Sequence, residues 1–369
     1  MIYLICFFFS VLFAHLAYRT NKIGYFIFYS IISILVTTML AGLRDYSVGI
    51  DTLNYYYGIW DWATTAESIP DFFEKYSLYS DEKNEWLFAT LVGLVAQIGD
   101  YHLLLFFVHL IIIGGVYIGA FRMRHHARPE IILLLFYLLY YNHSLNIYRQ
   151  YMAMAIVFAA VADVEKRKYL RYLIFVVIAA FFHRTAIIGV GPLILYVCLY
   201  PKKDKITVSN FQKIILLVAL IIFMSYLVVG IQFLLDAGLI NEDYEFFLDS
   251  SEASNYTMVL LFLLVELMAL GLTWQNFKKN TLLPDYFIFC TIAFFLLFLV
   301  GGDIIYGKRI AAYFSLLNIV TLGKMIHCQP TKENKTFYIV GIIVTVFVYW
   351  CYVFAYRNAS QTMPYILGI

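Results

Sequence analysis

Residues 103–121 read LLLFFVHLIIIGGVYIGAF, a run of nineteen residues without Asp, Glu, Lys or Arg. The hydrocarbon core of a bilayer is crossed by about 20 apolar residues in a helix, so this stretch predicts a membrane span. The composition of the whole chain also indicates a membrane protein. Of its 369 residues, 63% are hydrophobic and 14% are charged, against roughly 45–50% and about 25% in soluble proteins. This composition excludes a soluble enzyme, a disordered tail and a disulfide-stapled secreted module.

Similar apolar runs recur along the chain and predict an all-α, polytopic transmembrane helical bundle of about 12 spans, because lipid cannot satisfy a free backbone amide. The first run, Met1 to Tyr18, has its basic residues after the apolar core, the reverse of a signal peptide, and is expected to remain as a span with its N-terminus outside. We treat residues 1–369 as a single integral membrane domain. The further predicted spans are 23–41, 103–121, 131–145, 147–163, 169–183, 185–200, 211–235, 256–274, 284–301, 305–325 and 336–356.

Small residues at a spacing of four occur in two of these spans. They are the pairs Gly115 with Gly119 and Ala155 with Ala159. Pairs of this kind let two helix backbones approach closely. We therefore interpret them as packing positions.

Lysine and arginine gather in six connectors, which hold 18 of the 26 residues of these types. Cytoplasmic loops of membrane proteins carry such an excess, so the six connectors are predicted to be cytoplasmic. The opposite loops are acidic: residues 42–84 contain eight Asp and Glu, and the loop 236–255 contains six and no base. The six basic connectors are 19–22, 122–130, 163–171, 202–213, 278–285 and 324–335.

Residues 85–99 break the alternation of faces. Counted as a full span, they would invert everything downstream. Interpreted as a short re-entrant or interfacial helix inside an extracytoplasmic region 42–100, they leave all six basic connectors on one face and both termini outside. We favour the re-entrant interpretation over the full span.

Three arginines lie where a span meets the predicted outer face, against the topological bias: Arg44, Arg149 and Arg309. An arginine within a span costs about 2.5–3.5 kcal/mol on insertion scales. Its planar guanidinium stays charged and binds phosphate oxygens in pairs. Three such groups at one face suit a pyrophosphate whose lipid tail lies in the bilayer. A soluble anion would also fit, and for each arginine alone snorkelling or a structural ion pair is the alternative.

Two acids and a histidine accompany these arginines: Asp51, Glu85 and His183. A carboxylate or an imidazole can deprotonate an attacking hydroxyl while cations hold a departing phosphate. Each residue also has a structural interpretation, as a loop cap, a helix N-cap and a buried hydrogen-bonded histidine respectively. Glu266, in the middle of a predicted span, is a further candidate by its position alone.

Six short motifs occur in an order that resembles the EpsG family of Wzy-type polysaccharide polymerases. The family often has threonine at the position of Ile50, which is a mild departure. The motifs are AGLRDYSVGIDTLNY (41–55), NEWLF (84–88), YRQYMA (148–153), AFFHRTA (180–186), KRIAAYF (308–314) and MPY (363–365).

The resemblance implies a membrane glycosyltransferase of the bacterial inner (cytoplasmic) membrane. It would polymerise undecaprenyl-pyrophosphate-linked oligosaccharide repeat units into surface polysaccharide at the outer face. The implied partners are the lipid-linked donor and acceptor, the bilayer, a chain-length regulator and a flippase. Nucleic acid, a cofactor and a required metal are not expected, because no acidic pair has metal-ligand spacing and the five cysteines are scattered.

By the same resemblance, the motif positions fall into two groups. Arg44, Arg149, Gln150 and Arg309 match positions for the pyrophosphate and the substrate, and His183, Asp51 and Glu85 match catalytic positions. Among the last three, His183 is narrowly favoured as the base, because the unperturbed pKa of histidine, about 6.5, is nearest to neutral pH.

Two other function classes remain open. A transporter or flippase of lipid-linked sugar predicts charges near the bilayer midplane and two related halves, neither of which is evident in this sequence. A related oligosaccharide ligase uses the same chemistry on a different acceptor. Only the motifs argue against the ligase.

Overall fold

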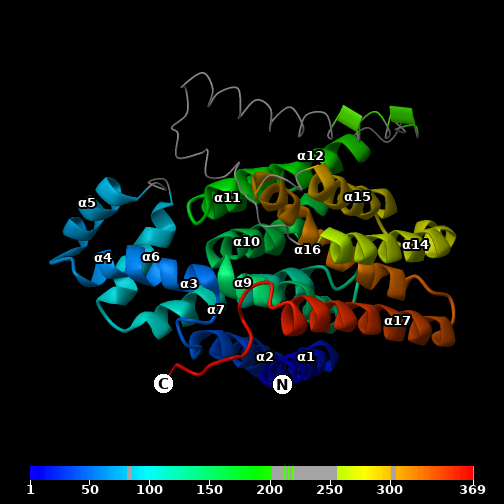
Figure 1. Cartoon of the computed structure of the whole chain (residues 1–369). Helices are drawn as coiled ribbons and strands as arrows, with labels where there is room; N and C mark the ends of the chain where they lie inside the picture. Colours follow the sequence, from blue (N-terminus) through cyan, green and yellow to red (C-terminus); the bar gives the residue numbers. More distant parts are fainter. Residues whose placement is uncertain are drawn as a thin grey trace. The chain divides into compact units, whose positions relative to one another are not determined.

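The computed structural model describes residues 1–80, 85–201, 256–300 and 305–368, with a few isolated residues between 209 and 219. Over these residues the chain is helical (Figure 1), and the only β-type pairing is an isolated bridge between Arg44 and Leu367. The chain divides into two compact units. Unit 1 comprises Met1–Ile187 with Val340–Ile369, and unit 2 comprises Ile188–Ile339. The single membrane domain predicted over 1–369 stays a prediction.

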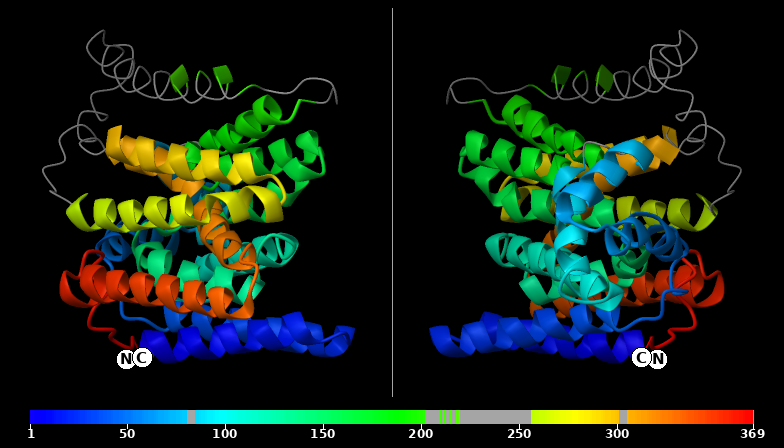
Figure 2. Two further views of the ribbon diagram at one scale, coloured as in Figure 1. Left: turned by 90° about the vertical axis from the view of Figure 1, so that its right-hand side faces the viewer. Right: turned by 90° about the vertical axis from the view of Figure 1, so that its left-hand side faces the viewer.

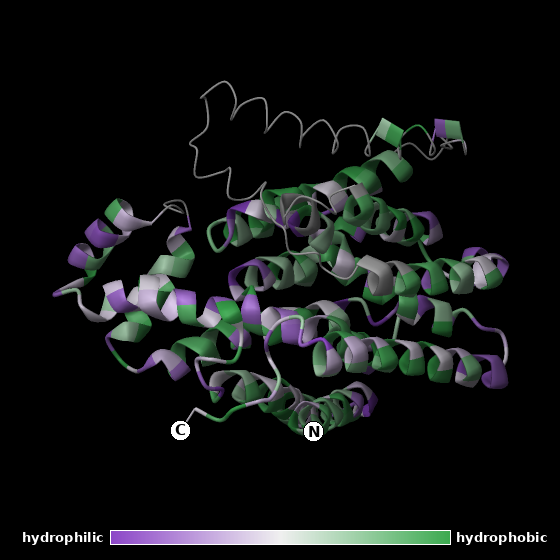
Figure 3. Ribbon diagram, viewed as in Figure 1, coloured by the Kyte–Doolittle hydropathy of each residue, from purple (hydrophilic) through white to green (hydrophobic). Residues whose placement is uncertain are grey.

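Unit 1 is built mainly on long helices, and the ribbons of α1, α2 and most of α17 are coloured predominantly as hydrophobic in Figure 3. Its long elements are α1 (Ile2–Arg19), α2 (Ile23–Gly42), α7 (Tyr101–Arg122), the continuous run of α8 (Pro129–Phe136), η2 (Tyr137–Tyr141) and α9 (Asn142–Asn146), α10 (Tyr148–Glu165), α11 (Tyr169–Ala180), and the later part of α17 (Lys332–Trp350) with η5 (Cys351–Tyr356). Its short elements are α3 (Ile50–Tyr55), η1 (Tyr56–Trp60), α4 (Asp61–Thr64), α5 (Ile69–Tyr79) and α6 (Trp86–Ala96). The 3₁₀ turn η3 (Arg184–Gly189) follows α11.

Helices α7 and α10 pack closely against each other. A Cβ atom added to Gly115 would lie 2.9 Å from the backbone of Ala155, and one added to Gly119 would lie 2.3 Å from the ring of Phe158. The two glycines therefore let α10 lie directly against α7. The prediction that these small residues serve packing is confirmed for Gly115, Gly119 and Ala155.

The two ends of unit 1 differ in chemistry. At one end, the basic connectors meet: His15 contacts Glu130, and Arg122 contacts Asp163. At the other end, both termini lie together (Figure 2), and the Tyr3 hydroxyl donates to the Thr362 carbonyl over 2.9 Å. The first three predicted cytoplasmic connectors thus share one end of unit 1. The membrane face that this end meets stays a prediction.

Unit 2 contains α12 (Val190–Leu199), α14 (Tyr256–Asn280), α15 (Pro284–Val300), α16 (Ile305–His327) and the start of α17. A buried polar chain links three of these helices. The Thr291 hydroxyl donates to Asn318 Oδ1 over 2.8 Å, and Asn318 Nδ2 donates to Glu266 Oε2 over 2.9 Å. The carboxyl group of Glu266, a candidate from its position in the sequence, therefore accepts a hydrogen bond from the side-chain amide of Asn318.

The all-α class and the membrane character are confirmed, but the number of spans is not. Within the described ranges, five helices are long and apolar enough to cross a membrane: Ile2–Arg19, Ile23–Gly42, Tyr101–Arg122, Arg309–His327 and Lys332–Tyr356. Several other predicted spans form shorter helices; α11, for example, has 12 residues, or about 18 Å, against a hydrocarbon core of about 30 Å. Twelve spans are therefore not confirmed. Nearly all of the predicted span 211–235 and the acidic loop 236–255 lie outside the described residues.

The segment 85–99 contains the helix α6, which has 11 residues. At a rise of about 1.5 Å per residue it is about 16 Å long, roughly half of a bilayer core. Its Phe88 and Val92 are buried, whereas Trp86 and Leu94 are exposed. This length fits a re-entrant or interfacial helix better than a full span. The depth of α6 in the bilayer stays a prediction.

Candidate active site

The Arg44 side chain connects the loop that follows α2 to the end of α9 through hydrogen bonds. Its side chain is completely buried. Nη1 donates to the Ala41 carbonyl over 2.7 Å, Nη2 to the Leu145 carbonyl over 2.9 Å, and Nε to the Val48 carbonyl over 3.3 Å. Since all three guanidinium nitrogens donate to backbone oxygens, this geometry favours a positioning role. The predicted contact of Arg44 with pyrophosphate stays a prediction.

The loop 43–49 turns at Gly49, so that Asp51 lies in the first turn of α3. Gly49 has a φ of +97°, a backbone conformation that favours glycine, and a Cβ atom there would lie 3.2 Å from the Leu145 carbonyl. The Asp51 amide donates to Asn146 Oδ1 over 2.8 Å. The Asp51 side chain is half-buried.

Glu85 is the centre of the site. It is completely buried just before α6. Oε2 accepts a hydrogen bond from Arg149 Nη1 over 2.7 Å, and Oε1 lies 2.7 Å from His183 Nδ1 and 3.2 Å from the backbone amide of Arg184. The structure thus brings together three of the residues predicted from sequence, from the starts of α6 and α10 and the end of α11. One carboxylate holds a permanent cation on one oxygen and an imidazole on the other.

Backbone hydrogen bonds explain why Glu85 and His183 meet. The Leu87 amide donates to the Phe181 carbonyl over 3.0 Å, which ties the first turn of α6 to the end of α11. The His183 amide donates to the Ala179 carbonyl over 2.9 Å and closes the last turn of α11. The two side chains therefore project from neighbouring helix ends that are joined through the backbone.

Two aromatic side chains hold the Arg149 guanidinium. Its Nε donates to the Tyr55 hydroxyl over 3.0 Å, and its Cζ lies 4.6 Å from the Tyr55 ring centroid and 5.5 Å from that of Phe88. Such faces attract a cation. Burial raises the pKa of the Tyr55 phenol, so the hydroxyl keeps its proton at neutral pH. Asp51, Glu85 and Arg149 all act electrostatically on this phenol, which places Asp51 close to the same cluster.

The C-terminal motif lies at the same end of unit 1. The Tyr365 hydroxyl donates to the Leu40 carbonyl over 2.9 Å, and the Asp45 amide donates to the Ile366 carbonyl over 2.8 Å. Asn142 Nδ2 donates to the Thr362 hydroxyl over 2.9 Å. The segment 362–367 therefore packs against the loop 43–49 and holds it in place. The MPY motif thus has a structural role in this loop rather than a role in catalysis.

The two remaining residues predicted for the site, Gln150 and Arg309, lie in different units of the chain. Gln150 is buried next to Arg149 on α10. Arg309 lies on α16 in unit 2, and its predicted role beside Arg149 stays a prediction. Sequence reasoning did not assign Tyr55 and Phe88 to Arg149. Their signal was present, since both lie inside the quoted motifs 41–55 and 84–88.

These observations define a helical membrane protein in which a buried carboxylate contacts a buried histidine and a partly buried arginine at one end of the first unit. The EpsG family matches residues 26–367, which is nearly the whole chain and includes every residue of the site. The chain therefore belongs to the EpsG family, a family of Wzy-like polymerases. This membership supports a polysaccharide polymerase type of membrane function. No curated protein and no solved structure matches the chain significantly.

Proposed function

We propose that this chain is a membrane glycosyltransferase that polymerises undecaprenyl-pyrophosphate-linked oligosaccharide repeat units into surface polysaccharide. The reaction takes place at the outer face of the bacterial inner membrane. The observation that carries the proposal is the Glu85 carboxylate, which joins Arg149 and His183 over 2.7 Å each. A cation for a leaving phosphate and a base for a hydroxyl are the two groups that glycosyl transfer from a pyrophosphate needs.

The reaction exchanges one bond to the anomeric carbon of the donor sugar for another. The bond between this carbon and the pyrophosphate oxygen breaks, and its electron pair leaves with the lipid pyrophosphate. A hydroxyl oxygen on the sugar of a second lipid-linked unit forms the new glycosidic bond to the same carbon. The proton of that hydroxyl passes to the base, and the growing chain moves onto the second unit.

In this reaction Arg149 binds the donor pyrophosphate and stabilises the charge that develops as it leaves. Glu85, Tyr55 and Phe88 fix the guanidinium in one orientation, so little reorganisation is needed during the reaction. Arg309 is proposed as the second pyrophosphate ligand. Gln150 is proposed as a substrate ligand, and Arg44 acts through the loop that it holds.

His183 takes the proton from the acceptor hydroxyl. Its Nδ1 is hydrogen-bonded to the Glu85 carboxylate, so a base acting from this ring uses Nε2. A carboxylate on the far nitrogen fixes the tautomer and stabilises the imidazolium that forms, as in hydrolase triads. Glu85 is therefore a positioning residue for both partners. Asp51, close to Tyr55, is proposed to orient the acceptor.

The test is complementation of a deletion strain, with extraction of surface polysaccharide and of lipid-linked repeat units. Wild-type protein restores long chains. Arg149→Lys and Arg309→Lys are expected to leave single repeat units on the terminal acceptor, with the protein still in the membrane. Arg171→Lys, an arginine with a 55% exposed side chain at the other end of unit 1, is the matched control.

Three results would contradict the proposal. Normal-length polymer in both variants would remove the arginines from the mechanism. Accumulation of lipid-linked units on the cytoplasmic side in the deletion strain would indicate a flippase. Full-length polymer that stays on its lipid carrier would indicate a ligase.

A further inference from the structure

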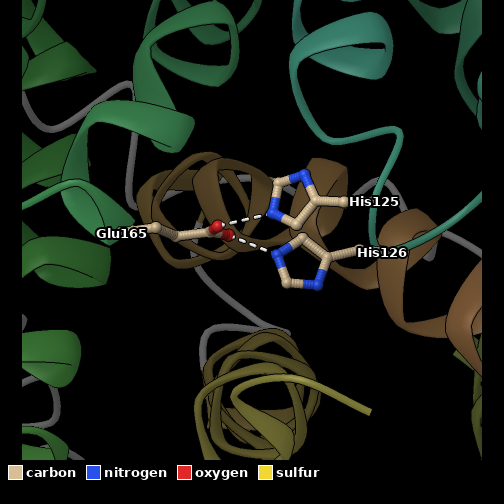
Figure 4. Close-up of side chains that lie close together, drawn as sticks. All are labelled: His125, His126 and Glu165. Carbon is tan, nitrogen blue, oxygen red and sulfur yellow. Dashed lines mark hydrogen bonds and ion pairs between the residues drawn. The ribbon is translucent and has the colours of Figure 1, made fainter.

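At the end of unit 1 opposite to Glu85, two histidines face one carboxylate (Figure 4). His125 and His126 lie in the connector between α7 and α8, and Glu165 is the last residue of α10. His125 Nε2 is 2.9 Å from Glu165 Oε2, and His126 Nε2 is 2.6 Å from Oε1. The three ligand-type atoms lie within 4.8 Å of one another, and no other such group of three occurs among the described residues.

The burial of the three side chains is graded. His126 is 1% exposed and Glu165 is 11% exposed, whereas His125 is 41% exposed. One side of the cluster is therefore enclosed by protein, and the other side, along the His125 ring, is open to water.

The backbone around the three residues is held by tight turns. The His126 amide donates to the Met123 carbonyl over 2.8 Å, and the Lys168 amide donates to the Asp163 carbonyl over 2.8 Å. The two helices that carry these turns, α7 and α10, pack through the glycine contacts described above. The ligand-type atoms are thus placed by rigid elements, which favours a preformed site.

Two other carboxylates at the same end of unit 1, those of Glu130 and Asp163, have different hydrogen-bond partners from Glu165. Glu130 accepts from His15 Nδ1 at 2.9 Å and also from Arg128 Nε at 2.7 Å. Asp163 accepts from Arg122 Nη2 over 2.6 Å. A guanidinium therefore lies against each of these two carboxylates. Glu165 contacts two imidazoles, which are themselves metal ligands.

We propose that His125, His126 and Glu165 bind a divalent transition-metal ion of the zinc class. The two nitrogens and the carboxylate oxygen supply three ligands of the type that Zn²⁺ prefers, and water on the exposed side of His125 supplies the fourth. The ion replaces the two hydrogen bonds between the histidines and Glu165, and any proton on a ligand nitrogen is released to solvent. The metal joins the connector between α7 and α8 to the end of α10.

The proposed metal is separate from the glycosyl-transfer site. Arg149 and Glu165 are 16 residues apart on α10, which is about 24 Å along the helix axis. The ion therefore takes no part in the reaction and acts on the end of unit 1 that carries the basic connectors. The site escaped the sequence analysis because His126 and Glu165 are 39 residues apart, with no recognised metal-ligand spacing.

The test is a Co²⁺ titration of the purified full-length protein in detergent, after chelator treatment and without a histidine tag. Tetrahedral Co²⁺ gives visible absorption bands, and Zn²⁺ should remove them by competition. We expect one equivalent to bind the wild type. Both His126→Ala and Glu165→Gln should weaken binding at least about tenfold. Zn²⁺ should raise the melting temperature of the wild type but of neither variant.

The matched control is His15→Ala, which removes the histidine of the neighbouring cluster and should leave Co²⁺ binding unchanged. Two results would overturn the proposal. One is the absence of saturable binding to the wild type. The other is binding to Glu165→Gln and His126→Ala that is as strong as binding to the wild type, which would place the ion elsewhere on the chain.

Discussion

Glu85 and Glu165 lie at opposite ends of unit 1, and each carboxylate joins two side chains that come from distant parts of the sequence. The two carboxylates differ in the type of side chain that they join. Glu85 holds an arginine and a histidine, whereas Glu165 faces two histidines. The arginine is a permanent cation that cannot ligate a metal, so the Glu85 end is suited to a phosphate and a proton transfer. The Glu165 end, with three possible ligands, is suited to a cation.

The largest effect is expected from Arg149→Lys, which keeps the charge at the Glu85 end but removes the planar fork. Lysine cannot donate to Glu85 and Tyr55 at the same time in the geometry of Arg149. We expect chain extension in isolated membranes to fall by about 100-fold or more, in line with the loss of one preorganised donor. The result is measured as polymer formed per unit of membrane protein. Activity near that of the wild type would show that charge alone suffices and that the fork is not needed.

The next effect tests whether Glu85 and His183 act as a unit. His183→Gln and Glu85→Gln are each expected to lower polymerisation by about 100-fold, the ordinary range for a lost general base. The double variant should be little worse than either single variant, because groups that act together are not additive. His102→Gln, a half-buried histidine at the same end, is the control. Effects that multiply in the double variant would separate Glu85 from the base.

Arg44→Lys tests the assignment of Arg44 as a positioning residue. The ammonium group of lysine cannot reach the three carbonyl oxygens that the guanidinium holds. Leaving buried carbonyls without a donor costs about 1–3 kcal/mol each, so the melting temperature and the amount of protein in the membrane should fall. Arg149→Lys should leave both nearly unchanged. A fully stable Arg44→Lys protein without activity would instead make Arg44 a direct ligand of the substrate.

The smallest effect concerns the helix packing that connects the two ends. Gly119→Ala places a Cβ atom 2.3 Å from the Phe158 ring, and overpacking of this kind costs about 1–3 kcal/mol. Gly114→Ala has no atom within 4 Å of the added Cβ and is the matched control. Thermal unfolding in detergent should separate the two variants. Equal melting temperatures would mean that α7 and α10 do not pack as closely as described.

The sequence allowed the Glu85 end to be predicted because membrane topology constrains it. Alternating spans place the starts of α6 and α10 and the end of α11 at one predicted face, and in the structure Glu85, Arg149 and His183 from these helix ends meet. The role of Arg44 was less predictable. Its position at a helix end is the same for a ligand-binding arginine and for a buried one, and only the contacts distinguish them.

Two other features were beyond the sequence for physical reasons. Hydropathy locates apolar runs but does not give the helix length that each run adopts, so the twelve predicted spans include segments as short as α11. The cluster around Glu165 depends on the contact between two connectors. No local pattern in either connector indicates that contact.

The most direct test of the central claim is reconstitution of the purified chain in liposomes with an undecaprenyl-pyrophosphate-linked repeat unit. We expect the wild type to release undecaprenyl pyrophosphate and to form chains of more than one unit. Glu85→Gln should do both about 100-fold more slowly, although it is inserted equally well. Transfer of the intact lipid-linked unit across the bilayer without any chain formation by the wild type would contradict the account.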